Sequence, residues 1–141
     1  MDKYADVLVV ECLALGMEQF KETIVSLLKE TLLSDGIKIR GVYERSDANE
    51  RKKEGLPKIK DFIGGEFDTD VEIVENGVRY MVDVVNGQKT GFSWIRSTIV
   101  LRCSAFAKTR SVRLLYAYGN VCVNAGIAGA TEVTGLDISE Y

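Results

Sequence analysis

The chain has 141 residues, of which 46% are apolar and 28% charged, and its formal net charge is −3. This composition is ordinary for a globular protein of one compact domain or two small ones, and the net charge gives no bulk attraction to nucleic acid. The chain contains no histidine, which removes the commonest general base. The sequence has neither a secretory signal nor an apolar run approaching the roughly 18 residues of a membrane span. We therefore expect a cytoplasmic protein without a membrane partner.

The cysteines do not form a metal-binding pattern. Cys12, Cys103 and Cys122 are odd in number and widely spaced. They lack C-x-x-C spacing, and no histidine is present to complete a metal site. We expect buried thiols and no bound metal.

The first elements are predicted to be a strand, a helix and a second strand. Residues 7–10 form a short β-branched run that is typical of a buried strand. An amphipathic helix is predicted over about residues 17–33, and Gly36 is expected to end it in the left-handed conformation. Residues 37–42 alternate in polarity as a strand does. The apolar face of the predicted helix comprises Phe20, Ile24, Leu27, Leu28 and Leu32.

A polar stretch follows at residues 45–57. One or two helical turns are predicted there, with Ser46 or Asp47 as the N-cap and Gly55 as the stop. A solvated surface is favoured over a contact with an RNA backbone, because acidic residues are interleaved and no stacking aromatic is present. The local basic cluster comprises Arg51, Lys52, Lys53, Lys58 and Lys60.

A β-hairpin is predicted from residues 71–75 and 78–84. The two segments flank Asn76-Gly77, which supplies the two positive φ angles of a type I′ turn. The hairpin would deliver Gln88, Lys89 and Thr90 to the end of its second strand. A loop residue in that position can be held firmly enough to contact a ligand.

The last part of the chain is predicted to form a small βαβ unit. Its strands are expected at residues 112–116 and 132–136, with a helix at 121–128 after a glycine turn. Asp137 follows the turn by about 20 residues, the spacing at which a carboxylate can bind a ribose. From these residues alone, a structural βαβ corner is favoured over nucleotide binding.

Three blocks of residues resemble a known protein family. They are Glu44-Arg45-Ser46-Asp47-Ala48, then Glu75-Asn76-Gly77 continuing to Gly87-Gln88-Lys89-Thr90-Gly91-Phe92, and then Gly129-Ala130 with Val133-Thr134-Gly135-Leu136-Asp137. These blocks resemble the S-adenosylmethionine-dependent RNA methyltransferases that make 5-methylcytosine in 23S ribosomal RNA. The resemblance implies an α+β central domain at residues 1–92, followed at 93–141 by the first βαβ of an incomplete α/β Rossmann-like methyltransferase domain.

The resemblance also implies roles for individual residues. Gln88, Lys89 and Thr90 would lie beside the S-adenosylmethionine pocket, the backbone at Gly119 would approach the methionine part, and Asp137 would bind the ribose. The chemistry needs a cysteine thiolate that attacks C6 of cytosine. That nucleophile belongs to a downstream region of the family, so we assign no catalytic residue here.

The implied protein is a truncated methyltransferase that acts on ribosomal RNA and is inactive by itself. Three alternatives stay open. The chain could be a non-enzymatic RNA-binding or adaptor module, a decayed gene product, or a homodimer in which a second copy completes the site.

Residues 93–119 depart from the family pattern. The family continues with Leu-Asp-Gln-x-x-Asn-Arg, whereas this chain reads Ser93-Trp94-Ile95-Arg96-Ser97-Thr98-Ile99-Val100, and no acidic residue occurs over 93–113. Codons can be chosen for Ser93 to Val100 that, when read from the last base of the Ser93 codon, encode Leu-Asp-Gln-x-x-Asn-Arg. This reading restores the family's spacing. We therefore hypothesise that about 93–119 is a frameshifted translation.

The nucleotide sequence around codons 90–145 tests the frameshift hypothesis. Read one base out of frame from about codon 93, it should encode Leu-Asp-Gln-x-x-Asn-Arg. DNA that encodes this motif in none of its frames would contradict the hypothesis.

Overall fold

The computed structural model describes residues 1–87, 105–115 and 119–136. The chain divides into two compact units, one of residues 1–73 and 79–92 and the other of residues 74–78 and 93–141. The elements before residue 88 are β1 (Asp2–Tyr4), β2 (Val7–Val10), α1 (Leu15–Glu18), α2 (Lys21–Ser34), β3 (Gly41–Ser46), the 3-10 helix η1 (Asn49–Glu54), β4 (Ile59–Ile63), β5 (Asp70–Glu75) and β6 (Val78–Asp83).

The first unit is built on a mixed sheet with the order β1-β2-β3-β4. Strands β2 and β3 are parallel, with Val7 opposite Gly41 and Val10 opposite Glu44, and the two outer pairs are antiparallel. A parallel pair needs a crossover connection, which α1 and α2 supply. All residues of β2 and β3 are buried, which agrees with the prediction of a buried strand at residues 7–10.

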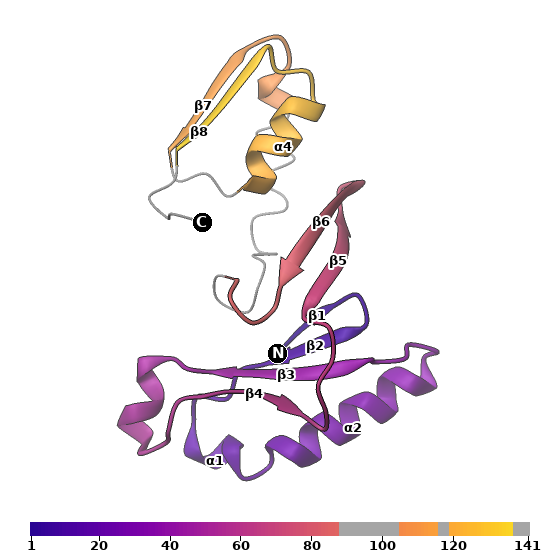
Figure 1. The fold of residues 1–141 in the computed structure, drawn as a ribbon, viewed down its shortest axis with the longest axis vertical. Coiled ribbons are helices and arrows are strands. Elements are labelled where there is room, and N and C mark those ends of the chain that lie inside the picture. Colours follow the sequence, from indigo (N-terminus) through magenta and orange to yellow (C-terminus); the bar gives the residue numbers. More distant parts are fainter. Residues whose placement is uncertain (88–104, 116–118, 137–141) are drawn as a thin grey trace. The chain divides into compact units, whose positions relative to one another are not determined.

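Both faces of this sheet carry an apolar core. On one face, α2 packs Val25, Leu28 and Leu32 against side chains of β2 and β3, and Figure 1 shows α2 running along that face. On the other face, the β5-β6 hairpin contributes Val71, Ile73, Val82 and Val84. The period-two alternation of β2 and β3 divides their side chains between the two cores.

The helix predicted over residues 17–33 is two helices. Phe20 has φ −105° and ψ 1°, outside helical values, and it separates α1 from α2. The buried face of α2 is also rotated from the prediction, because Phe20 and Leu27 are 59% and 57% exposed. Glu18 and Lys21, on either side of the break, form an ion pair with their charged atoms 2.7 Å apart. A helix prediction that rests on the spacing of apolar residues takes no account of this ion pair.

Other boundaries also differ from the predictions. The strand expected from residue 37 begins at Gly41, although Ile39 is buried. The N-cap of η1 is Ala48 rather than Ser46 or Asp47, because Ser46 is still part of β3. Strands β1 and β4 were not predicted. The predictions that Gly36 and Gly55 adopt the left-handed conformation at the ends of their helices are confirmed, because their φ angles are 78° and 73°.

The β5-β6 hairpin is confirmed. Asn76 and Gly77 both have positive φ, 54° and 79°, as a type I′ turn requires. Along β5, buried and exposed residues alternate, so that one face of the hairpin packs on the sheet and the other does not.

The second unit contains a strand, a helix and a strand. These are β7 (Ser111–Leu115), α4 (Gly119–Ile127) and β8 (Glu132–Leu136). The two strands are parallel, with Ser111 opposite Glu132. The predicted order of elements is therefore present, and its identification as the start of a Rossmann-like domain stays a prediction.

The fold requires a glycine at position 41, because a side chain there would collide with the ring of Phe67. A Cβ atom at Gly41 would lie 2.1 Å from Cδ1 of Phe67, and Phe67 packs against the core on the hairpin face. We expect Gly41→Ala to lower the free energy of unfolding by about 1–3 kcal/mol, measured by urea denaturation. Gly16→Ala is the control, because nothing lies within 4 Å of a Cβ at Gly16. Equal stabilities for Gly41→Ala and wild type would contradict this packing.

Candidate functional site

Strand β3 ends in three consecutive buried polar residues, Glu44, Arg45 and Ser46. Their side chains alternate between the two faces of the sheet. Glu44 and Ser46 share a face with Val42, which packs in the core beneath α2. Arg45 shares a face with Tyr43, which packs in the core beneath the hairpin. Each face therefore has its own polar site next to an apolar core.

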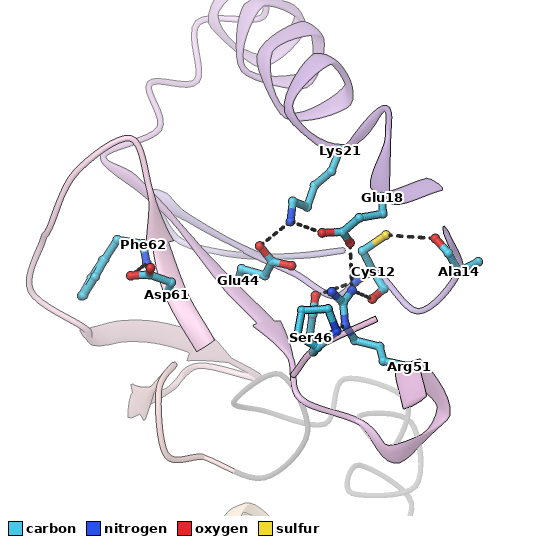
Figure 2. Close-up of polar contacts among 10 residues, drawn as sticks. Cys12, Ala14, Glu18, Lys21, Glu44, Ser46, Arg51, Asp61 and Phe62 are labelled. Carbon is cyan, nitrogen blue, oxygen red and sulfur yellow. Dashed lines mark hydrogen bonds and ion pairs between the residues drawn. The ribbon is translucent and has the colours of Figure 1, made fainter. Parts of the chain in front are cut away.

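The site on the helix face is a group of charged and polar side chains that we call the Arg51 cluster. Lys21 lies between Glu18 and Glu44, and each of the two ion pairs is 2.7 Å long (Figure 2). The backbone N–H of Cys12 donates a hydrogen bond to Oγ of Ser46, 3.0 Å away. The cluster comprises Cys12, Glu18, Lys21, Glu44, Ser46 and Arg51.

Arg51 is fully buried at the centre of this cluster. Its Nη1 donates to Oε2 of Glu18 at 2.8 Å and to the carbonyl of Cys12, and its Nε donates to the carbonyl of Pro57 at 2.7 Å. Arg51 thereby ties η1 to α1 and to the end of β2.

The prediction that Arg51 belongs to an exposed basic cluster is wrong, because Glu18 neutralises its charge inside the protein. Lys52, Lys53 and Lys58 are exposed, and Lys60 pairs with Asp47 at 3.5 Å. These changes weaken the case for an RNA-backbone contact at this surface.

The contacts in the Arg51 cluster shift several pKa values. Hydrogen bonds from Arg51 and then Lys21 lower the pKa of Glu18 to about 2, against the opposing effect of burial. Burial works to lower the pKa of Lys21, but its bonds to Glu18 and Glu44 outweigh burial and raise it. These contacts therefore favour the charged forms of Glu18 and Lys21.

Cys12 is not an activated nucleophile. Burial, followed by its interaction with Glu18, raises the pKa of the thiol. Sγ donates to the carbonyl of Ala14 at 3.7 Å, and Cys12 lines a cavity of about 490 Å³ whose other walls include Val10, Met17 and Ile24. A thiol nucleophile needs a lowered pKa. The expectation of a buried thiol is confirmed for Cys12, whereas Cys122 is half-buried and Cys103 lies outside the described residues.

The site on the hairpin face is the turn at the end of β6, residues 83–87. Oδ1 of Asp83 accepts hydrogen bonds from the N–H groups of Val85 and Asn86 at 2.8 and 2.9 Å, and Oδ2 accepts from Nδ2 of Asn86 at 2.8 Å. The N–H of Gly87 donates to the carbonyl of Asp83 at 2.9 Å. Asp83 therefore organises the turn that leads to Gln88.

Two cations bind carbonyl groups of this turn. Nη1 of Arg45 donates to the carbonyl of Gly87, and Nζ of Lys60 donates to the carbonyl of Val85 at 3.4 Å. Burial works to raise the pKa of Asp83, but the hydrogen bonds from Asn86 and Val85 and the charge of Arg45 outweigh it and lower the pKa. The turn is thus charged and well bonded immediately before the predicted cofactor segment.

Most of the predicted cofactor residues fall outside the described part of the chain. These are Gln88, Lys89, Thr90 and Asp137. Gly119 is described and is the first residue of α4. Asp137 directly follows β8, and Gly119 follows β7 by a short connection. Because β7 and β8 are parallel neighbours, their carboxyl ends lie at one edge of this sheet.

The structure adds residues that the sequence analysis did not assign to a site. Asp83 had a local signal, since an aspartate followed by asparagine and glycine at a strand end favours a turn of this kind. Arg45 and Arg51 had none, because their partners are 42 and 39 residues away in the sequence.

The described residues offer neither a metal site nor a membrane-spanning helix. Among them, no group of three or more cysteine or acidic side chains could hold a metal ion. No helix in the same ranges has the length and apolar character needed to cross a membrane.

Glu18 makes the stability of the Arg51 cluster depend on pH. Its pKa falls from the usual 4.5 to about 2 on folding, so its stabilisation is complete above pH 4.5 and is lost as the pH falls through 2. Glu18→Gln should lower the free energy of unfolding by about 1–3 kcal/mol at pH 7, and by much less at pH 2.

Urea denaturation at pH 7, 4 and 2 measures this difference. Glu22→Gln, an exposed residue of α2, is the control and should match wild type at every pH. A loss for Glu18→Gln that is equal at pH 7 and pH 2 would contradict the charged pairing.

The chain is similar over nearly its whole length to bacterial methyltransferases. It is 39% identical to the ribosomal RNA large subunit methyltransferase I of Pseudoalteromonas atlantica and 37% identical to that of Shewanella amazonensis. Each match covers 99% of this chain and 34% of the relative, so the chain spans about one third of the length of these proteins. No protein-family model matches the chain.

A solved structure has the same fold over the same extent. It is a protein described as a methyltransferase in complex with SAH, with a TM-score of 0.78 and 22% identity, and the match covers 99% of this chain and 34% of that one. The homologues of this chain are thus ribosomal RNA large subunit methyltransferases, and its mixed α/β fold also occurs in this solved structure.

Proposed function

We propose that this chain is the cofactor-adjacent third of an S-adenosylmethionine-dependent RNA methyltransferase. The observation that carries the proposal is the 39% identity to the Pseudoalteromonas atlantica relative along 99% of this chain. We assign residues 1–92 to the central α+β domain of such an enzyme and residues 93–141 to the start of its Rossmann-like domain.

The cofactor would be held by two parts of the chain. Gln88, Lys89 and Thr90 follow the hydrogen-bonded turn at residues 83–87 in the sequence, and the resemblance implies that they contact the ligand. Gly119 begins α4, and Asp137 follows β8, at the strand ends where nucleotide ligands bind in parallel sheets. The solved relative in complex with SAH supports the choice of ligand.

The substrate would be ribosomal RNA, and the acceptor atom would be C5 of cytosine. The similarity to ribosomal RNA large subunit methyltransferases supports large-subunit ribosomal RNA as the substrate. The assignment of C5 as the acceptor atom rests on the three blocks of residues that resemble the cytosine methyltransferases. Methyl transfer to C5 requires a thiolate that first adds to C6 of the ring.

This chain alone would be inactive, because no described cysteine suits the role of nucleophile. Cys12 is buried with a raised pKa, and none of Cys12, Cys103 and Cys122 lies in a matching motif. We therefore assign no catalytic residue within the 141 residues.

Calorimetry with S-adenosylmethionine tests the proposal. Asp137 can bind ribose hydroxyls through charge-assisted hydrogen bonds, each worth roughly 1.5–3 kcal/mol, only if the adenine and methionine ends of the ligand are enclosed as well. We expect the isolated chain to bind no better than about 1 mM, which corresponds to roughly 4 kcal/mol.

Two variants define the result. Asp137→Ala should weaken whatever binding is measured, and Asp35→Ala, at the exposed end of α2, should leave it unchanged. Micromolar binding that disappears in Asp137→Ala would refute the inactive fragment and would favour a site completed by a second copy of the chain.

A further inference from the structure

The segment just before β3 borders a groove that the proposed function has not used. Two hollows of about 460 and 370 Å³ adjoin there, because Lys38 and Ile39 line both of them. We propose that this groove, which we call the Arg40 groove, binds single-stranded RNA, with a base stacked on Arg40 and a phosphate beside Lys38. The inference rests on the proposed function, in which the substrate is ribosomal RNA, and adds a surface that contacts the strand.

Arg40 is held in place by contacts on one side. Its backbone N–H donates to the carbonyl of Asp6 at 2.7 Å, and its Nε pairs with Oδ2 of Asp6 at 3.2 Å. Its Cζ lies over the ring of Phe67, 5.9 Å from the ring centre. That ring is itself fixed, because it packs edge to face on Phe62 with the two ring centres 5.2 Å apart. The guanidinium therefore rests on a fixed aromatic support.

The rest of the Arg40 side chain is open to a ligand. The side chain is 36% exposed, and among the described residues its Nη1 and Nη2 make no hydrogen bond or ion pair. An exposed ion pair such as that with Asp6 contributes little to stability, so stability alone does not account for the arrangement. A planar guanidinium that is supported on one side and open on the other suits the stacking of an unpaired base.

Lys38 supplies a charge for a phosphate next to this stacking position. Lys38 and Arg40 are exposed and Ile39 between them is buried, so the two cations face the same side, as alternate residues of an extended chain do. Lys29 of α2 lines the adjoining hollow. Neither lysine has an ion pair with any described residue. Both ammonium groups are therefore free to bind the backbone of a strand.

The charge and shape of the groove favour RNA over an acidic segment of a protein. Its walls carry an excess of cations, although the whole chain has a net charge of −3. An acidic peptide would use the same cations but has no flat base to place on Arg40. The charged residues of the walls are Lys29, Lys38 and Arg40 against Asp6 and Glu30.

The test measures binding of a fluorescein-labelled oligouridylate to the full chain by fluorescence anisotropy over a range of salt concentrations. Arg40→Lys keeps the charge but removes the planar group, and Lys38→Gln removes a charge that has no partner to lose. Arg79→Lys is the matched control for the first change, because the side chain of Arg79 is 75% exposed on the hairpin. Lys53→Gln is the control for the second, because Lys53 is an exposed lysine of η1. Inorganic polyphosphate serves as a competitor that carries charge without bases.

We expect Arg40→Lys to weaken binding of the oligouridylate about fivefold or more, whereas Arg79→Lys binds as wild type does. Lys38→Gln should lower the slope of log Kd against log salt by about 0.7, the value for one phosphate contact on a single strand, and Lys53→Gln should leave it unchanged. At equal phosphate concentration, unlabelled oligouridylate should displace the label better than polyphosphate does. This preference should disappear in Arg40→Lys.

Four results would overturn the inference. They are no binding of the oligouridylate by wild type, equal affinity of Arg40→Lys and wild type, equal salt slopes for Lys38→Gln and Lys53→Gln, and equal competition by polyphosphate. The last result would indicate a surface that recognises charge alone, as an acidic protein partner would require. Failure at the groove leaves the proposed function standing, because transfer of methyl groups to RNA tests that function separately.

Discussion

The end of β3 constrains the rest of the first unit, because three consecutive polar side chains are buried there on two faces of one sheet. An unpaired polar or charged group inside a protein costs free energy, so each face must supply partners. On the helix face, Glu44 bonds Lys21 of α2 and Ser46 bonds the backbone of Cys12. On the hairpin face, Arg45 bonds the carbonyl of Gly87. One strand end thereby fixes both the helical layer and the turn that follows β6.

The two faces differ in what their polar groups can do. The Arg51 cluster contains two carboxylates and two cations in mutual contact, so its charges are compensated within the fold. Replacing one member leaves another buried charge without its partner, which is why such clusters hold a geometry firmly whatever their net contribution to stability. The turn at residues 83–87 instead leads directly to the segment that resembles a cofactor-binding motif. The contacts of the Arg51 cluster are therefore all internal to the fold, whereas the turn at residues 83–87 directly precedes the residues for which the resemblance implies a cofactor contact.

The sequence predicted the elements whose signals are local. Asn76-Gly77 determines its own turn, and the β-branched run at residues 7–10 needs burial rather than a particular partner. Strand β1 has three residues, and it is a strand because β2 pairs with it. The burial of Arg51 depends on its contacts with Glu18 and Cys12, which are far away in the sequence, so no pattern of spacing could reveal it. For the same reason the resemblance could indicate Gln88, Lys89 and Thr90, whereas Arg45 emerged only from its contact with Gly87.

Methyl transfer by a chimera would test most directly whether this chain belongs to an RNA methyltransferase. Residues 1–92, or all 141 residues, would each replace only the stretch that they match in the Pseudoalteromonas atlantica relative, with the intact relative as the positive control. Transfer of tritiated methyl groups from S-adenosylmethionine to large-subunit ribosomal RNA would be counted, and bisulfite sequencing would locate any methylated cytosine. We expect the chimera with residues 1–92 to methylate the same nucleotide as the intact relative, and the chimera with all 141 residues to be inactive. A folded chimera with residues 1–92 that binds RNA but transfers no methyl group would contradict the assignment.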